Sequence, residues 1–145
     1  GFTYETFQKS LFALHALSIK VIVHLILGLP HETREMMSAS VQAIANLPVW
    51  GIKLQLLHVL SGTDLAAYYE KTHFPVFSMD EYCEMIIDCL ELLPPEMVIH
   101  RITGDGPKDL LIAPMWSTGK RTVLNQIHRR LKERNTYQGR LATKR

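Results

Sequence analysis

The stretch from Lys20 to Thr33, KVIVHLILGLPHET, constrains the fold of this chain more than any other segment. Residues 21–27 form a nearly continuous run of β-branched and aliphatic side chains, interrupted only by His24. Such a run is typical of a parallel strand covered on both faces, because a strand with one solvent face alternates instead. Gly28 and Pro30 then indicate a loop, because glycine permits unusual backbone angles and proline fixes the direction of the chain. Ligands of α/β folds bind outside the carboxyl ends of parallel strands, so the Gly28 loop is the first candidate site.

Helical spacing, capping residues and turn residues divide the rest of the chain. They predict helices over residues 3–17, 33–47, 78–93 and 117–134, and a short helix that follows the loop at 61–63 and contains Tyr68 and Tyr69. They predict strands over 20–27, 52–60 and 97–102, and a brief extended piece at 110–113. Strands that alternate with helices form right-handed βαβ units and a parallel sheet. Three strands are only part of a barrel, and an open sheet leaves exposed edges. We therefore expect partner strands before Gly1 in a longer protein.

The charge of the chain is concentrated at its end. Residues 120–145 hold nine Lys and Arg and one Glu, whereas residues 1–119 hold seven basic and thirteen acidic residues. A basic segment on an acidic body is typical either of a nucleic-acid contact or of a solvated terminal helix, and we expect residues from Asn135 onward to be loose. No apolar run approaches a membrane span and no leader precedes the first helix, so we expect a cytoplasmic protein without a membrane partner.

Two groups of residues suggest chemistry. His24, His58 and His100 lie in three successive predicted strands and could form an open zinc site, or each could satisfy its own hydrogen bond in a polar interior. No Asp or Glu lies within these strands to complete a common ligand set. The turn at Thr103–Pro107 places Asp105 between two glycines, where it is either a functional residue or part of a structural turn.

The two cysteines, Cys83 and Cys89, are six residues apart. That spacing fits neither a zinc knuckle nor a redox pair, so we expect reduced, half-buried thiols.

Four segments together resemble the carboxyl-terminal half of a YhcC-like radical SAM protein, in the group that includes the Elongator subunit and oxygen-independent coproporphyrinogen oxidase. They are GFTYE, HLILGLPHETREMM, KLQLLHVLSGTDL and HRITGDGPKDLLIAPMWSTGK, and they cover nearly all of the chain. The resemblance implies an α/β fold, the carboxyl-terminal portion of a (β/α)6 partial TIM-type barrel. Residues 1–95 would be its last two strand–helix units, and residues 96–145 an extension with a strand, the GDGP turn and a basic helix.

Radical SAM proteins hold a [4Fe–4S] cluster through three cysteines in a C-x3-C-x2-C loop. The cluster cleaves S-adenosylmethionine (SAM) reductively to methionine and a 5′-deoxyadenosyl radical, which takes hydrogen from the substrate. That cysteine loop is absent here, so the resemblance implies no metal site in this chain and no stable binding of either cofactor to it alone.

The resemblance also implies site residues. The first predicted strand resembles the family's fifth strand, whose adenine-contact motif is roughly GxIxGxxE: Ile26 and Gly28 match it, His24 replaces the first glycine, and Glu32 is displaced by one position. Ile26 and Gly28 are therefore the expected SAM contacts, with His24 beside them.

The second predicted strand resembles the sixth, which adds Leu57, His58 and Val59 as cofactor contacts, and Asp105 is the candidate on the substrate side. The intact parent would be a cytoplasmic iron–sulfur enzyme that combines this chain with the first half of the barrel and acts on a small molecule or tRNA. The alternatives are a histidine-based metal hydrolase and an RNA-binding module that uses the basic tail.

Overall fold

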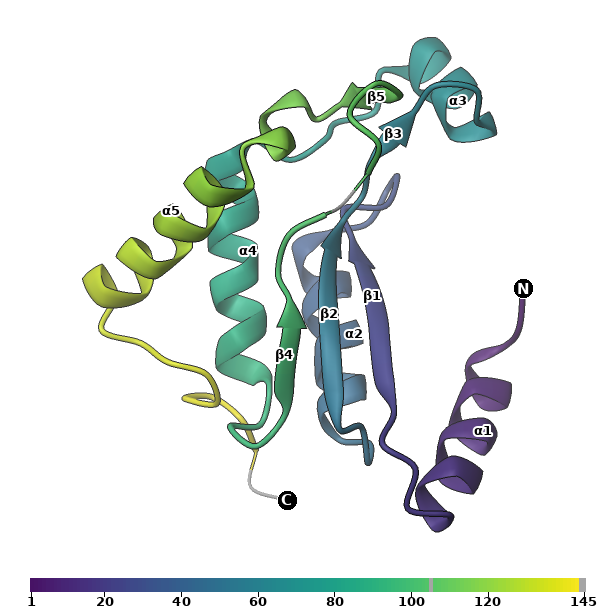
Figure 1. The fold of residues 1–145 in the computed structure, drawn as a ribbon, viewed down its shortest axis with the longest axis vertical. Helices are drawn as coiled ribbons and strands as arrows, with labels where there is room; N and C mark the ends of the chain where they lie inside the picture. The colour runs from purple at the N-terminus through teal and green to yellow at the C-terminus, as the bar shows by residue number, and fades with distance from the viewer. Residues whose placement is uncertain (105, 144–145) are drawn as a thin grey trace.

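The computed structural model describes residues 1–104 and 106–143 (Figure 1). The helices are α1 (Tyr4–Ala16), α2 (Arg34–Ala45), α3 (Asp64–Thr72), α4 (Met79–Leu92) and α5 (Lys120–Glu133), with a short 3-10 helix, η1, at Met115–Thr118. The strands are β1 (Ile22–Leu27), β2 (Gly51–Leu56), β3 (Val59–Leu60), β4 (Val98–Arg101) and β5 (Leu111–Ala113).

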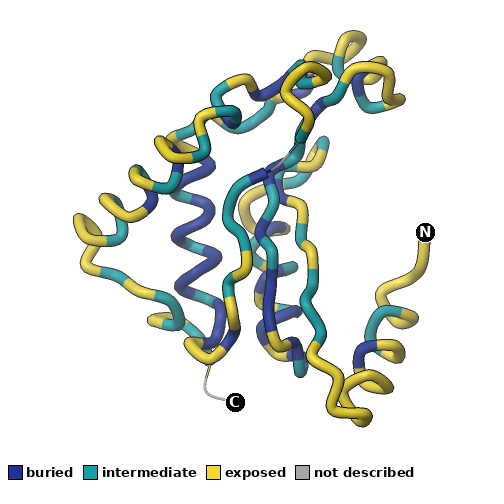
Figure 2. Tube along the Cα trace, viewed as in Figure 1, coloured by how far each residue is buried: buried dark blue, intermediate teal, exposed yellow. Residues whose placement is uncertain are grey.

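The predicted parallel sheet is confirmed. β1, β2 and β4 lie side by side in that order, and both pairings are parallel. Each connection carries a helix back to the start of the next strand, which is why the strands share one direction. Ile52, Leu54 and Leu56 of β2 are buried in the core with residues of α2 and α4, and α4 is buried along most of its length (Figure 2).

The opposite face of the sheet, called the inner face below, is open. His24 and Ile26 of β1 are register partners of Lys53 and Gln55 of β2, so these four side chains share it. His24 is exposed and Ile26 is 44% exposed, whereas Leu27 is fully buried. The expectation that β1 is covered on both faces is therefore wrong for the described residues, since none of them forms a layer over this face.

The sheet is open at its sides as well. Within the described residues, β1 pairs only with β2, and β4 only with β2. Beyond the outer edge of β1 lies α1 (Figure 1), and the groove between them has a volume of about 750 Å³. Phe2 and Phe7 line one side of this groove, and residues 21–25 with Ile44 line the other. A groove lined mainly by apolar side chains beside a free strand edge is where a further strand or helix can pack.

The second predicted strand is divided. β2 ends at Leu56, the N–H of Leu57 donates to the carbonyl of Leu27 (3.0 Å), and the chain turns before β3. β3 then pairs antiparallel with β5, which confirms the short extended piece predicted at 110–113. Val59 is fully buried in a small second core with Ala66, Phe74 and Ala113. The mainly apolar run of residues 52–60 could not predict this change of strand partner, because hydrophobic periodicity does not indicate which sheet a strand joins.

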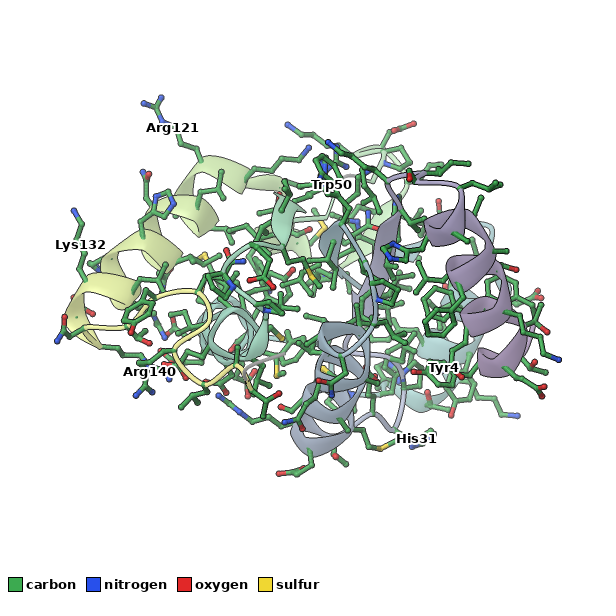
Figure 3. All side chains as sticks on the ribbon, turned by 90° about the horizontal axis from the view of Figure 1, so that it is seen from below. Tyr4, His31, Trp50, Arg121, Lys132 and Arg140 are labelled. Carbon is green, nitrogen blue, oxygen red and sulfur yellow. The ribbon has the colours of Figure 1, made fainter. Side chains whose placement is uncertain are left out.

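The basic carboxyl-terminal segment docks on α4. Arg130 pairs with Asp80 (2.7 Å) and Glu84, and Arg134 pairs with Glu84 (2.9 Å). Beyond α5, Arg140 pairs with Glu91 at 2.9 Å. At least three of the nine basic residues of this segment are thus paired with acidic residues of α4, whereas Arg121 and Lys132 project outward from α5 (Figure 3).

Residues 135–142 are held by hydrogen bonds to the same surface, so the prediction of a loose end from Asn135 is wrong for them. Gly139 N–H donates to the carbonyl of Leu90 (3.0 Å), and Leu141 N–H donates to that of Glu91 (2.8 Å). The Gln138 amide donates to the carbonyls of Pro94 and Met97 (2.7 and 2.8 Å). None of the helices built from described residues is both long enough and apolar enough to cross a membrane.

Candidate functional site

The turn at the carboxyl end of β1 is fixed from two sides. Gly28 has φ +86°, and a Cβ added there would lie 2.9 Å from the ring of Phe77. The Glu32 carboxylate accepts hydrogen bonds from the N–H groups of Gly28 (3.0 Å) and Leu29 (3.1 Å). Glu32 therefore positions the loop through these two hydrogen bonds. The Phe77 ring leaves no room for a side chain at position 28, which must be glycine.

Phe77 is itself held in place by Trp116 and Tyr82. Its carbonyl accepts a hydrogen bond from Nε1 of Trp116 (2.7 Å), and its ring packs edge-on against Tyr82, with centroids 5.8 Å apart. The hydroxyl of Tyr82 donates to the carbonyl of Ile102 (3.1 Å), and burial raises the pKa of Tyr82, so this hydroxyl stays protonated. Sequence reasoning missed Phe77, because its contact with Gly28 joins residues about fifty positions apart.

Gly104 and Gly106 lie against the ring of His58. A Cβ on Gly104 would overlap the His58 ring, and a Cβ on Gly106 would lie 2.7 Å from its Nδ1. The Nε2 atom of His58 is buried. The packing against His58 therefore explains why positions 104 and 106 are glycines, because neither position has room for a side chain. Asp105, the predicted substrate-side residue, lies outside the described residues.

The structure brings some of the expected cofactor contacts together and separates others. His24 and Ile26 lie on the inner face, and Gly28 follows at the end of the same strand. Leu57, half-buried, is tied to that end by its hydrogen bond to Leu27. The side chain of Val59, by contrast, is enclosed in the second core and is not exposed on the inner face.

The three histidines do not form a metal site. His100 contacts Gly51 and Trp50 at the amino end of β2, whereas His58 lies beyond its carboxyl end. At about 3.3 Å per residue these positions are roughly 20 Å apart. In residues 1–104 and 106–143 no group of three His, Cys, Asp or Glu could hold a metal ion. The three-histidine zinc site is therefore wrong.

The two cysteines do not fit an iron–sulfur cluster either. Cys83 and Cys89 are both fully buried in α4, not half-buried as predicted from their spacing. Burial raises the pKa of Cys83, and it raises that of Cys89 to about 12. Cluster ligation requires accessible thiolates, and these thiols are neutral and enclosed.

Comparison with known proteins identifies the family. Residues 49–133 match the model of the Radical_SAM C-terminal domain, which is more than half of the chain. The chain belongs to the radical SAM C-terminal domain family. The match spans β2 through α5, so it includes the TGDGP turn and the basic helix.

Curated relatives agree with this family. The chain is 50% identical over 121 residues to Bacillus subtilis YtqA, which covers 83% of this chain and 38% of that protein. It is 32% identical over 132 residues to Methanocaldococcus jannaschii MJ0486, an alignment that covers 90% of this chain and 41% of that protein. It is 27% identical over 133 residues to Escherichia coli YhcC, covering 92% of this chain and 43% of that protein. The chain thus spans about two fifths of the length of these relatives.

A solved structure has the same fold. The archaeal Methanocaldococcus infernus Elp3 with an N-terminal deletion (1–46) matches with a TM-score of 0.79 at 19% identity, over 95% of this chain and 32% of that one. The predicted α/β fold of a carboxyl-terminal radical SAM portion and the predicted YhcC-like resemblance are both confirmed.

Proposed function

We propose that this chain supplies one side of the SAM site of a radical SAM enzyme. The observation that carries the proposal is the Gly28 turn, held by Glu32 and Phe77 at the carboxyl end of β1, with the exposed side chain of Ile26 beside it on the inner face. Ile26 offers an apolar surface to the adenine ring. Gly28 lets the backbone make the turn at φ +86° with the Phe77 ring packed against it, which fixes the loop beside that surface. His24 lies two residues before Ile26 on the same face, and the backbone of Leu57 is joined to the end of β1 by its hydrogen bond to Leu27.

The iron–sulfur chemistry comes from outside this chain in the proposal. The two buried cysteines are unsuited to the cluster, so its ligands belong to the first half of the barrel. When bound, the cluster supplies the electron that cleaves SAM to methionine and a 5′-deoxyadenosyl radical, which takes hydrogen from the substrate. The residues of this chain orient SAM and exclude water around it.

The first half of the barrel is also the proposed partner of the open edge. The outer edge of β1 and the groove of about 750 Å³ beside α1 accept a further parallel strand, which would continue the sheet into a partial TIM-type barrel. The assembled protein would be a cytoplasmic enzyme whose substrate, a small molecule or tRNA, enters the inner face.

The test uses the full-length gene product that carries this chain, reconstituted with iron and sulfide without oxygen. 5′-Deoxyadenosine formed after addition of SAM and a reductant is the readout. We expect Ile26→Asp to lower SAM cleavage at least tenfold and to raise the KM for SAM. The matched control is Ile19→Asp, because Ile19 is similarly exposed (48% against 44%) but precedes β1. Equal activity of both variants, or no cleavage by the unmodified protein, would refute the proposal.

A further inference from the structure

A row of nitrogen-bearing side chains crosses the sheet. His24 of β1 is the register partner of Lys53 of β2. Lys53 is in turn the register partner of Arg101 of β4, across an irregularity in the pairing of β2 with β4. Neighbouring strands lie about 4.8 Å apart, so the row spans roughly 10 Å. Gln55 lies two residues after Lys53 on the same inner face, and β1, β2 and β4 contain no Asp or Glu.

Most of this hydrogen-bonding capacity is unused within the chain. Outside the backbone pairing of the sheet, the side chains of Lys53, Gln55 and His24 make no hydrogen bond or ion pair with any part of the chain that the structure describes. Lys53 and Gln55 are only half-exposed, so each has lost part of its hydration without gaining a protein partner.

We propose that the inner face binds a phosphate group of a small-molecule substrate, with Lys53 at its centre and His24 and Gln55 as neighbouring donors. A phosphate matches these donors better than a carboxylate does, because it carries more oxygens and up to two negative charges. The inference rests on the proposed function only in taking the inner face as the substrate side.

The basic surface of α5 does not explain this feature. Lys132 projects into solvent from α5, on a different part of the molecule (Figure 3), whereas Lys53 lies at the middle of the sheet. Long-range attraction of anions by the charge of the whole chain would depend on both lysines equally. A binding site on the inner face would depend on Lys53 alone. Lys132 is therefore the matched control for Lys53.

The experiment is a titration of the 145-residue chain with inorganic phosphate, followed by amide NMR at constant ionic strength. We expect saturable shifts at residues 51–55, a loss of affinity of at least fivefold in Lys53→Met, and an unchanged affinity in Lys132→Met. Lys53→Arg keeps the charge and is expected to bind within about twofold of the unmodified chain. Undisturbed amide spectra away from residues 51–55 will show that each variant is folded.

Two further measurements distinguish phosphate binding from the binding of carboxylates and of nucleic acid. Acetate should bind at least tenfold more weakly than phosphate, and a short single-stranded oligonucleotide should not compete with phosphate at residues 51–55. Absence of saturable shifts, equal effects of the two Met variants, acetate binding equal to phosphate binding, or oligonucleotide competition at those residues would overturn the inference. The titration needs neither SAM nor a cluster, so its failure is distinguishable from failure of the proposed function.

Discussion

Gly28→Ala tests the most specific packing contact in the candidate site. A residue with a Cβ pays about 1–2 kcal/mol to adopt left-handed φ values such as the +86° of Gly28. The new methyl would also lie 2.9 Å from the Phe77 ring, and overpacking of this kind costs about 1–3 kcal/mol. We therefore expect Gly28→Ala to lower the free energy of unfolding by about 2–5 kcal/mol.

Gly62→Ala is the matched control, because Gly62 has φ +78° but no atom within 4 Å of an added Cβ. It shares the backbone cost and the entropy change of the unfolded chain, so the difference between the variants isolates the Phe77 contact. Urea denaturation followed by circular dichroism measures both. In a Phe77→Leu background, Gly28→Ala should cost little more than Gly62→Ala. Equal losses for the two glycine variants, within about 0.5 kcal/mol, would refute the argument.

Two further variants test the packing of the carboxyl-terminal half. Burial alone would raise the pKa of Glu91, but hydrogen bonds from Thr136 and Arg140 and nearby positive charge lower it below its usual 4.5. The contribution of Glu91 to the free energy of unfolding is thus complete above that pH and is lost as the pH falls below it, so the urea midpoint should drop on acidification. Glu91→Gln should reduce this drop, and near neutral pH it should lower the free energy of unfolding by about 1–3 kcal/mol. A pH profile of Glu91→Gln identical to that of the unmodified chain would contradict this account. Gly104→Ala should displace the His58 ring and destabilise the chain by about 1–3 kcal/mol, seen as shifted His58 ring resonances, and unchanged resonances would show that the turn does not cover this ring.

Local patterns predicted the elements whose determinants are local. The capping box at the start of α4 is present as expected, since Ser78 N–H donates to the Glu81 carboxylate (2.9 Å) and Glu81 N–H donates to the Ser78 hydroxyl (3.2 Å). The apolar run before Gly28 likewise predicted β1 and the parallel sheet.

Features that depend on distant partners were not predictable in the same way. The break between Leu56 and Val59 depends on pairing with β5, fifty residues later in the chain. The ordered path of residues 136–142 depends on α4 and its acidic residues, which a charge count alone does not place opposite them.

The candidate site shows the same division. Gly28 and Ile26 came from a motif resemblance, and the structure explains why a glycine is required there, while contact with SAM stays a prediction. Phe77 and Trp116 are supports that no spacing rule identifies, because they reach the Gly28 turn only through the packed fold.

The central claim is that the open edge of β1 is completed by the rest of a radical SAM barrel, and amide hydrogen exchange tests it most directly. The comparison is between this chain alone and the full-length gene product. We predict that alternate amides of β1, those directed to its outer edge, exchange at least a hundredfold more slowly in the full-length protein, while the amides of β2 are protected in both. Equal exchange of β1 in the two samples would contradict the account.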